Sequence, residues 1–193
     1  FRSGYLVIPY TIADYLSGNT GGFSDTSASE FIETEKGIQD NIQRMLSIKG
    51  SQTVDEIHKK LGLVMWENVG MARNKEGLKK AIIEIPKLRK EFWEDVNIPG
   101  SSNSMNTELE KAGRLADFLE LGELMARDAL EREESCGGHF REEFQTEENE
   151  AKRDDKNFTF VSAWEFKGVE KEPVVHKEDL VFENVKLTTR SYK

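Results

Sequence analysis

The residues best suited to chemistry gather in one short segment, from Glu134 to Arg141. Ser135, Cys136 and His139 lie there, with further glutamates on both sides. Cysteine and histidine are zinc ligands, but a structural zinc site normally needs four nitrogen or sulfur donors, and only two are present here. We therefore favour a structural histidine in a tight turn over a metal site.

Two other catalytic arrangements fit the sequence poorly. Ser135 and His139 could act as nucleophile and base, but no nucleophile elbow surrounds them and a Gly-Gly turn separates them. The glycines from Gly18 to Gly22 have neither the G-x-G-x-x-G spacing nor the P-loop spacing that cradles a phosphate. The spacing of these residues alone therefore names no activity.

The composition disfavours nucleic acid as a partner. The 193 residues carry a net charge of −9, and 33% of them are charged while 37% are hydrophobic. Because phosphate binding needs clustered lysine and arginine, we expect no nucleic-acid binding. Such a balance is typical of surface-rich helices and polar loops.

The cellular location is indicated by features that the sequence lacks. Cys136 is the only cysteine, so no intramolecular disulfide can form, which favours the cytoplasm. No segment approaches the roughly 20 apolar residues of a membrane-spanning helix, and the N-terminus lacks the layout of a signal peptide. We expect any membrane association to occur through partner subunits. Because Phe1 rather than Met opens the chain, we also expect a piece of a larger polypeptide.

Three amphipathic segments must position the residues from Glu134 to Arg141. A capping box of Thr53 and Glu56 opens the first, Asn74 is a plausible N-cap for the second, and residues 104–134 form the third. Each segment carries apolar residues at helical spacing, so the three most simply pack as an antiparallel bundle. The stripes include Val54, Ile57, Leu61, Val64 and Met65, then Leu78, Ala81, Ile82, Ile85, Leu88 and Phe92, then Leu109, Ala112, Leu115, Ala116, Leu119, Met125, Ala129 and Leu130.

Further elements are expected on both sides of this bundle. Residues 5–16 form an apolar strip, and a capping box of Ser27 and Glu30 predicts an extra helix that runs to about Ser47. The three tryptophans lie on or beside apolar stripes, so we expect them in the core or in an interface; they are Trp66, Trp93 and Trp164.

The C-terminal part changes character. Residues 141–156 are highly charged and should follow the surface as an extended polar strap. Alternating residues from Phe160 to Phe166 and from Asp179 to Phe182 predict a small β-hairpin, with Gly168 and Pro173 in the turn. The fold class is therefore mainly α: an antiparallel three-helix bundle similar to a spectrin repeat, with an N-terminal helix, a polar strap and a C-terminal hairpin.

Two segments resemble the flavoprotein subunits of fumarate reductase and succinate dehydrogenase. They are Leu61–Asn74, with its Met-Trp-Glu-Asn-Val run, and Arg132–Phe144, which is similar to the family's Glu-Ser-Arg-Gly-Ala-His motif. The resemblance extends to Arg153-Asp154-Asp155 and to the opening Gly4–Leu16. Cys136 and Gly138 replace the family's arginine and alanine, which points to the bacterial quinone-linked branch.

The resemblance implies structural or interface roles rather than catalysis. The matched positions are Trp66, Glu67, Asn68, Glu134, Ser135, His139, Arg141, Arg153, Asp154 and Asp155. Of these, His139 and Arg141 are expected to hydrogen-bond or pair across a junction with the flavin domain. The resemblance also implies a division into a flavin-domain junction with its linking helix (1–50), the bundle (51–136), and the strap with the hairpin (137–193).

For the parent enzyme, the resemblance implies interconversion of fumarate and succinate linked to quinone. FAD would be held outside this chain, which contains none of the family's catalytic, cofactor-binding or metal-binding residues. The implied partners are the chain's own flavin-binding domain, an iron–sulfur subunit and, indirectly, a membrane-anchor cytochrome. The assembled enzyme would be peripheral on the inner face of the cytoplasmic membrane.

Other interpretations remain open beside this one. Within the family, L-aspartate oxidase has a related C-terminal bundle; outside it, a stand-alone acidic helical adaptor fits the composition. We also expect that the apolar strip and Trp164, if uncovered, drive self-association of the isolated chain.

Overall fold

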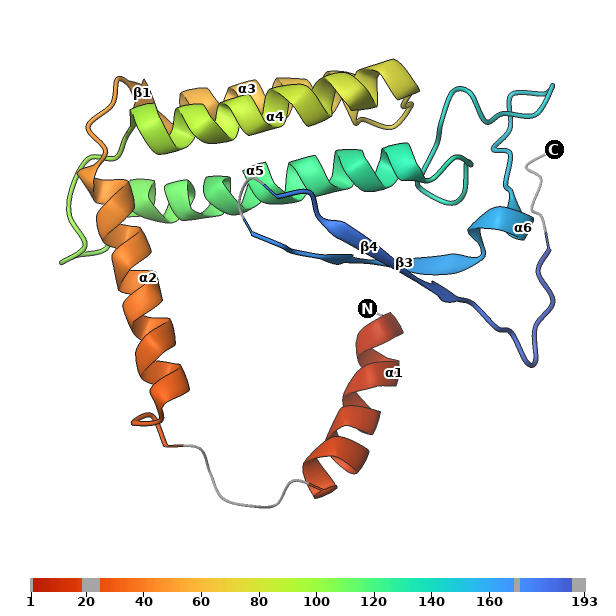
Figure 1. The fold of residues 1–193 in the computed structure, drawn as a ribbon, viewed down its shortest axis with the longest axis horizontal. Coiled ribbons are helices and arrows are strands. Elements are labelled where there is room, and N and C mark those ends of the chain that lie inside the picture. The colour runs from red at the N-terminus through yellow and green to blue at the C-terminus, as the bar shows by residue number, and fades with distance from the viewer. Residues whose placement is uncertain (1, 19–24, 169–170, 189–193) are drawn as a thin grey trace. The chain divides into compact units, whose positions relative to one another are not determined.

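A computed structural model describes residues 2–18, 25–168 and 171–188 (Figure 1). The chain forms two compact units, residues 1–43 and 44–193. The predicted turn from Gly18 to Gly22 lies mostly outside the described residues. The candidate site lies in the second unit, which holds the bundle and the hairpin.

The first unit is helical and presents apolar side chains to solvent. Helix α1, Arg2–Tyr10, continues as a π-helical segment η1, Thr11–Leu16, and α2 spans Ser29–Ser47. The end of α2, from Arg44 onward, belongs to the second unit. The capping box predicted at Ser27 is wrong, because α2 begins two residues later and the Ser27 N–H donates to Asp25 Oδ1 at 2.9 Å. The apolar strip is exposed at Val7, Ile8, Tyr10, Ile12, Tyr15 and Leu16.

The second unit is built on α3 (Val54–Asn68), α4 (Lys75–Asp95) and α5 (Thr107–Glu131). Strand β1, Gln52–Thr53, immediately precedes α3 and pairs with β2, Val96–Asn97, which immediately follows α4. The start of α3 therefore lies beside the end of α4, so these helices are antiparallel. All three helices contact one another, and α5 runs alongside α3 and α4 in Figure 1, which confirms the predicted bundle.

Side-chain caps set the helix boundaries. Thr53 Oγ1 accepts from the Glu56 N–H at 3.2 Å and Glu56 Oε2 accepts from the Thr53 N–H at 2.7 Å, which confirms the capping box. Asn74 Oδ1 caps α4 through the Gly77 N–H at 2.8 Å, as predicted. Asn106 caps α5, so this helix is shorter than the predicted 104–134.

The core contains the predicted stripes except Met125, which is exposed and lines a groove instead. Ile57 of α3, Ile85 and Phe92 of α4, and Leu119 of α5 are fully buried, and each such side chain contributes about 1.5–3 kcal/mol through the hydrophobic effect. Trp93 packs against this core as expected, with its ring centroid 5.0 Å from that of Phe92.

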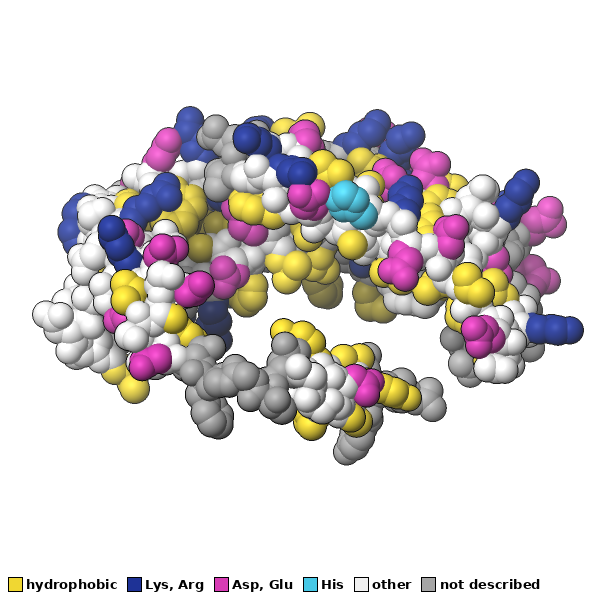
Figure 2. Space-filling view, turned by 60° about the horizontal axis from the view of Figure 1, so that its bottom comes forward, with side chains coloured by type: hydrophobic (Ala, Val, Ile, Leu, Met, Phe, Trp, Pro, Cys, Tyr) yellow, Lys and Arg dark blue, Asp and Glu magenta, His cyan; other side chains and the backbone are white. Residues whose placement is uncertain are grey.

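A buried ion-pair network joins α4 to α5. Glu123 accepts from Arg89 Nη1 at 2.7 Å and from Arg127 Nε at 2.8 Å, and all three side chains are largely buried. On the face shown in Figure 2, acidic and basic side chains are interspersed around apolar ones. That surface offers no broad basic patch of the kind that nucleic acid requires.

The polar segment after α5 differs from the extended strap that we expected. It doubles back, because the Ser135 N–H donates to the Lys152 carbonyl at 2.9 Å and the Lys152 N–H donates to the Phe144 carbonyl at 3.1 Å. Backbone hydrogen bonding within the segment thus replaces solvation of an extended chain. A short helix, α6, follows at Asp155–Phe158.

The C-terminal hairpin is present, with one strand displaced from its prediction. Strand β3, Phe160–Glu165, pairs antiparallel with β4, Val174–Asp179, so the second strand predicted at Asp179–Phe182 is wrong. Gly168 and Pro173 both lie in the connection between β3 and β4, as predicted, and Pro173 directly precedes β4. The Trp164 Nε1–H donates to Asp128 Oδ1 at 2.8 Å, which fixes β3 to α5.

Candidate functional site

Arg141 is the centre of the site and is only 1% exposed. Its Nη1 donates to the carbonyls of Ala129 at 2.9 Å and Leu130 at 3.3 Å, and its Nε donates to Glu143 Oε2 at 3.0 Å. The last carbonyls of a helix carry partial negative charge, so this guanidinium caps α5 electrostatically. The side chain is therefore not available for the pairing across a domain junction that we expected.

Ser135 is fully buried and serves the same turn. Its Oγ accepts from the Arg141 N–H at 2.8 Å and donates to the Arg141 carbonyl at 3.2 Å. The hydroxyl therefore uses both its donor and its acceptor on the backbone of Arg141. The side chain of His139 reaches Arg132 and Arg73 instead of Ser135, so the geometry offers no serine nucleophile.

Glu134 connects the turn to the downstream Arg-Asp-Asp run. It is buried, and its two oxygens accept from Arg132 Nη1 at 2.7 Å and from the Asp154 N–H at 2.9 Å. Arg153 pairs with Asp155 through Nε at 2.9 Å. Two parts of the sequence that match the family motif thus meet in space.

The contacts of His139 define its protonation state. Its Nδ1 lies 3.0 Å from Arg73 Nη1 and its Nε2 lies 2.9 Å from the Arg132 carbonyl. An arginine only donates and a carbonyl only accepts, so the ring is neutral with its proton on Nε2. Burial lowers the pKa of His139; the hydrogen bond to the Arg132 carbonyl opposes this, and the nearby cations Arg73, Arg141 and Arg132 lower it further.

Arg73 is the residue of this site that sequence reasoning missed. Its N–H donates to the Phe140 carbonyl at 3.1 Å and its carbonyl accepts from the Glu142 N–H at 2.8 Å, so the α3–α4 loop is bonded to the turn after α5. Asn74 Nδ2 adds a bond to Glu142 at 2.9 Å. The only signal in the sequence was that Arg73 falls inside the resembling segment Leu61–Asn74.

The Met-Trp-Glu-Asn part of that segment is divided between the core and the surface. Asn68 is buried and its Nδ2 donates to the Val64 carbonyl at 3.0 Å. Glu67 is exposed, and Trp66 is 83% exposed, so Trp66 does not join the core. These residues lie at the end of α3, and the loop that follows them is bonded to the turn after α5.

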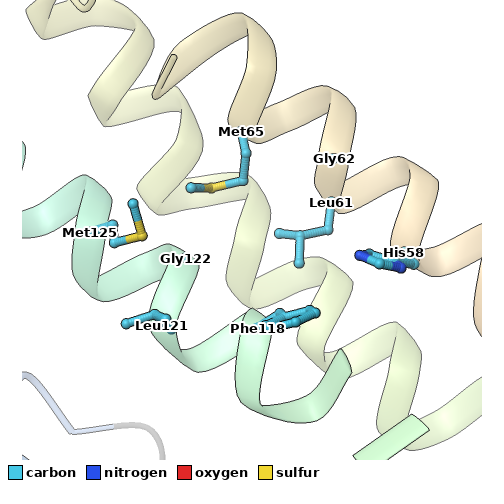
Figure 3. Close-up of a pocket in the computed structure, with 8 residues that line it drawn as sticks. All are labelled: His58, Leu61, Gly62, Met65, Phe118, Leu121, Gly122 and Met125. Carbon is cyan, nitrogen blue, oxygen red and sulfur yellow. The ribbon is translucent and has the colours of Figure 1, made fainter. Parts of the chain in front are cut away.

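A shallow groove of about 210 Å³ lies between α3 and α5 (Figure 3). Its lining is almost entirely apolar, and the ring of its single histidine lies 5.7 Å from the ring of Phe118. Among the described residues no group of three or more histidine, cysteine, aspartate or glutamate side chains could hold a metal ion. The groove is lined by His58, Leu61, Gly62, Met65, Phe118, Leu121, Gly122 and Met125.

The sequence of residues 58–192 matches the profile of a known family, described as fumarate reductase flavoprotein C-term. The match covers well over half of the chain, including α4, α5, the 134–141 turn and the hairpin. The chain belongs to the fumarate reductase flavoprotein family. The two segments that resemble the family, at the end of α3 and in the turn after α5, are joined by the loop at Arg73.

Individual members of the fumarate reductase flavoprotein family support this assignment. The fumarate reductase flavoprotein subunit of Proteus vulgaris is 33% identical over 132 residues, which are 68% of this chain and 21% of that protein. The succinate dehydrogenase flavoprotein subunit of Bacillus subtilis is 25% identical over 141 residues, 73% of this chain and 24% of that protein. This chain therefore spans about a fifth to a quarter of the length of these relatives.

The fold of this chain also resembles that of a solved fumarate reductase. The FrdA chain of Escherichia coli quinol fumarate reductase superposes with a TM-score of 0.71 and 26% identity, over 87% of this chain and 27% of that one. In the part of this chain that the structure describes, no helix combines the length and apolar character needed to cross a bilayer.

Proposed function

We propose that this chain is the C-terminal region of the flavoprotein subunit of a quinone-linked fumarate reductase or succinate dehydrogenase. The observation that carries the proposal is the family match over residues 58–192, supported by the superposition on FrdA. The names of the relatives favour this function over an L-aspartate oxidase or a stand-alone adaptor. The whole subunit would interconvert fumarate and succinate.

The role of the region itself is structural. Ser135, Glu134 and Arg141 have their polar groups bonded within the chain, so they organise a turn rather than carry chemistry. We retain the other matched positions as structural or interface residues. The division into 1–50, 51–136 and 137–193 likewise stays a proposal for how the region connects to its neighbours.

The residues that the structure describes do not fit FAD. The groove between α3 and α5 is small and apolar, and it offers no glycine-rich loop leading into a helix N-terminus for a pyrophosphate. We therefore place FAD in the flavin-binding part of the subunit, with an iron–sulfur subunit and a membrane-anchor cytochrome as further partners. The assembled enzyme would lie peripherally on the inner face of the cytoplasmic membrane.

A chimera tests the proposal. The part of the Proteus vulgaris subunit that matches this chain is replaced by this chain, and reduction of fumarate by a reduced viologen dye is measured. We expect activity well above that of a control chimera carrying an unrelated three-helix bundle. An inactive chimera, no better than this control, would contradict the proposal and favour an independent adaptor.

A further inference from the structure

Arg73 is a partly buried cation that lacks a carboxylate partner in the part of the chain that the structure describes. Arg132 and Arg141 each form an ion pair with a glutamate, at 2.7 and 3.0 Å, whereas no such pair within 4.0 Å involves Arg73. Asp128 acts on it only from farther away. Burial lowers the pKa of Arg73, so the site does not stabilise its charge fully.

The guanidinium of Arg73 is held in a fixed orientation with one edge free. Its Nε donates to the Gly70 carbonyl at 3.1 Å and its Nη1 donates to His139 at 3.0 Å. Of its five N–H groups, both on Nη2 have no partner among the described residues. No buried side-chain nitrogen or oxygen in those residues lacks a partner, so Nη2 must be open to solvent.

Two large apolar side chains shortly before this cation in the sequence are almost fully exposed. Trp66, in the last turn of α3, is 83% exposed, and Met71, in the next loop, is 91% exposed. A Cβ on Gly70 would lie 2.6 Å from the Trp66 carbonyl, so the loop closes tightly on α3. Tryptophan, methionine and arginine are the residue types enriched in protein interfaces.

The loop that carries Met71 and Arg73 is already fixed in place by hydrogen bonds. The Arg73 N–H donates to the Phe140 carbonyl, and the Arg73 carbonyl accepts from the Glu142 N–H. The Arg73 side chain donates to His139. A partner that binds here need not pay for ordering the loop, which raises the affinity that a few contacts can deliver.

We propose that Trp66, Met71 and Arg73 form a docking surface for a carboxylate-bearing segment of the flavin-binding part of the same subunit. This inference rests on the proposed function and adds the surface through which the region docks. The free edge of Arg73 would take the carboxylate, ideally through two parallel hydrogen bonds, while Trp66 and Met71 would be covered by apolar side chains.

The covalent connection favours this partner over a separate protein. In the relatives, the matched region is about a fifth to a quarter of one long polypeptide. Tethering of this kind raises the effective concentration of the partner segment to the millimolar range. A surface with three main contacts, too small for a strong bimolecular complex, is sufficient under that condition.

Hydroxyl-radical footprinting tests the docking surface directly, because exposed tryptophan and methionine side chains are oxidised fastest. The oxidation rates of Trp66 and Met71 are compared between the isolated 193-residue chain and the Proteus vulgaris chimera. Met105 is 96% exposed and lies in the α4–α5 connection, so it is the matched control. Met125 reports on the α3–α5 groove.

We expect oxidation of Trp66 and Met71 to be on the order of tenfold slower in the chimera, with Met105 unchanged, because docking excludes water. An active chimera in which both residues stay as reactive as in the isolated chain would overturn the inference and leave the proposed function standing. Protection of Met125 alone would also overturn it, in favour of the groove. Slow oxidation of Trp66 and Met71 in the concentrated isolated chain would overturn the inference and assign the surface to a second copy of the chain. A chimera without activity would overturn both this inference and the proposed function.

Mutation gives an independent readout. Trp66→Ala should leave the melting temperature of the isolated chain unchanged, because the side chain is exposed, but should lower the temperature at which the chimera releases flavin fluorescence. Arg73→Gln should also lower it in the chimera, and Met105→Ala should not. Equal release temperatures for all variants would contradict the docking surface.

Discussion

The guanidinium of Arg141 donates from Nη1 to the carbonyl of Ala129 at 2.9 Å, so a fully buried cation ends the longest helix of the bundle. The same side chain pairs with Glu143, and the backbone of Arg141 is bonded to Ser135. One residue therefore connects α5 to the turn that follows it.

Arg141→Ala should destabilise the chain by about 3 kcal/mol, because it leaves buried carbonyls without a donor. Chemical denaturation followed by circular dichroism measures this. The matched control is Arg114→Ala, which removes an exposed ion pair to Glu110 on the same helix and should cost less than about 0.5 kcal/mol. Similar effects for both variants would show that Arg141 does not cap α5.

The stability of the chain should fall as the pH falls through the range where His139 titrates. The pKa of His139 is lowered in the folded chain, so the unfolded chain binds more protons in acid and stability rises with pH. The contribution of His139 to the stability of the fold is present above the ordinary pKa of histidine, about 6.5. It is lost as the pH falls from that value through the lower pKa of the folded state.

His139→Gln tests the origin of this pH dependence. A glutamine amide can accept from Arg73 and donate to the Arg132 carbonyl but does not titrate. The variant should lose less stability than the wild type between neutral and mildly acidic pH, as followed by urea denaturation. His58 and His176 remain in both proteins. An unchanged dependence of stability on pH would therefore show that a group other than His139 causes it.

The two capping boxes expected from the sequence should differ in their energetic importance. Thr53→Ala removes the observed cap of α3 and should cost about 1 kcal/mol. Ser27 lies before the start of α2, so Ser27→Ala should change the free energy of unfolding by only a few tenths of a kcal/mol. Thermal denaturation of the two variants distinguishes a cap that is present in the structure from one suggested by sequence alone.

The exposed apolar strip of the first unit should promote association of the isolated chain. Ile8 and Ile12 are both exposed. The double variant Ile8→Asp, Ile12→Asp should therefore shift the chain toward monomer in sedimentation velocity. Trp164, which we had expected to contribute, is bonded to Asp128 instead, so Trp164→Phe should leave the distribution unchanged. A wild-type chain that is monomeric at all concentrations would contradict this prediction.

The bundle could be predicted from sequence because its signals are local. Thr53 and Asn74 bond to N–H groups three residues away, and the apolar stripes recur at the period of the helix. Arg73 could not be found in this way, since its partners His139 and Phe140 are more than sixty residues away and are brought close only by the fold. The sequence could not decide between the core and an interface for Trp66, because position on a helix does not reveal which flank stays uncovered.

We propose that this chain completes a flavoprotein without holding the flavin. Flavin content per chain, measured by visible absorbance after gel filtration, tests this most directly on the isolated 193-residue chain and on the Proteus vulgaris chimera. We expect no flavin on the isolated chain and about one flavin per molecule of the chimera. Stoichiometric flavin on the isolated chain would contradict it, as would a chimera that binds none.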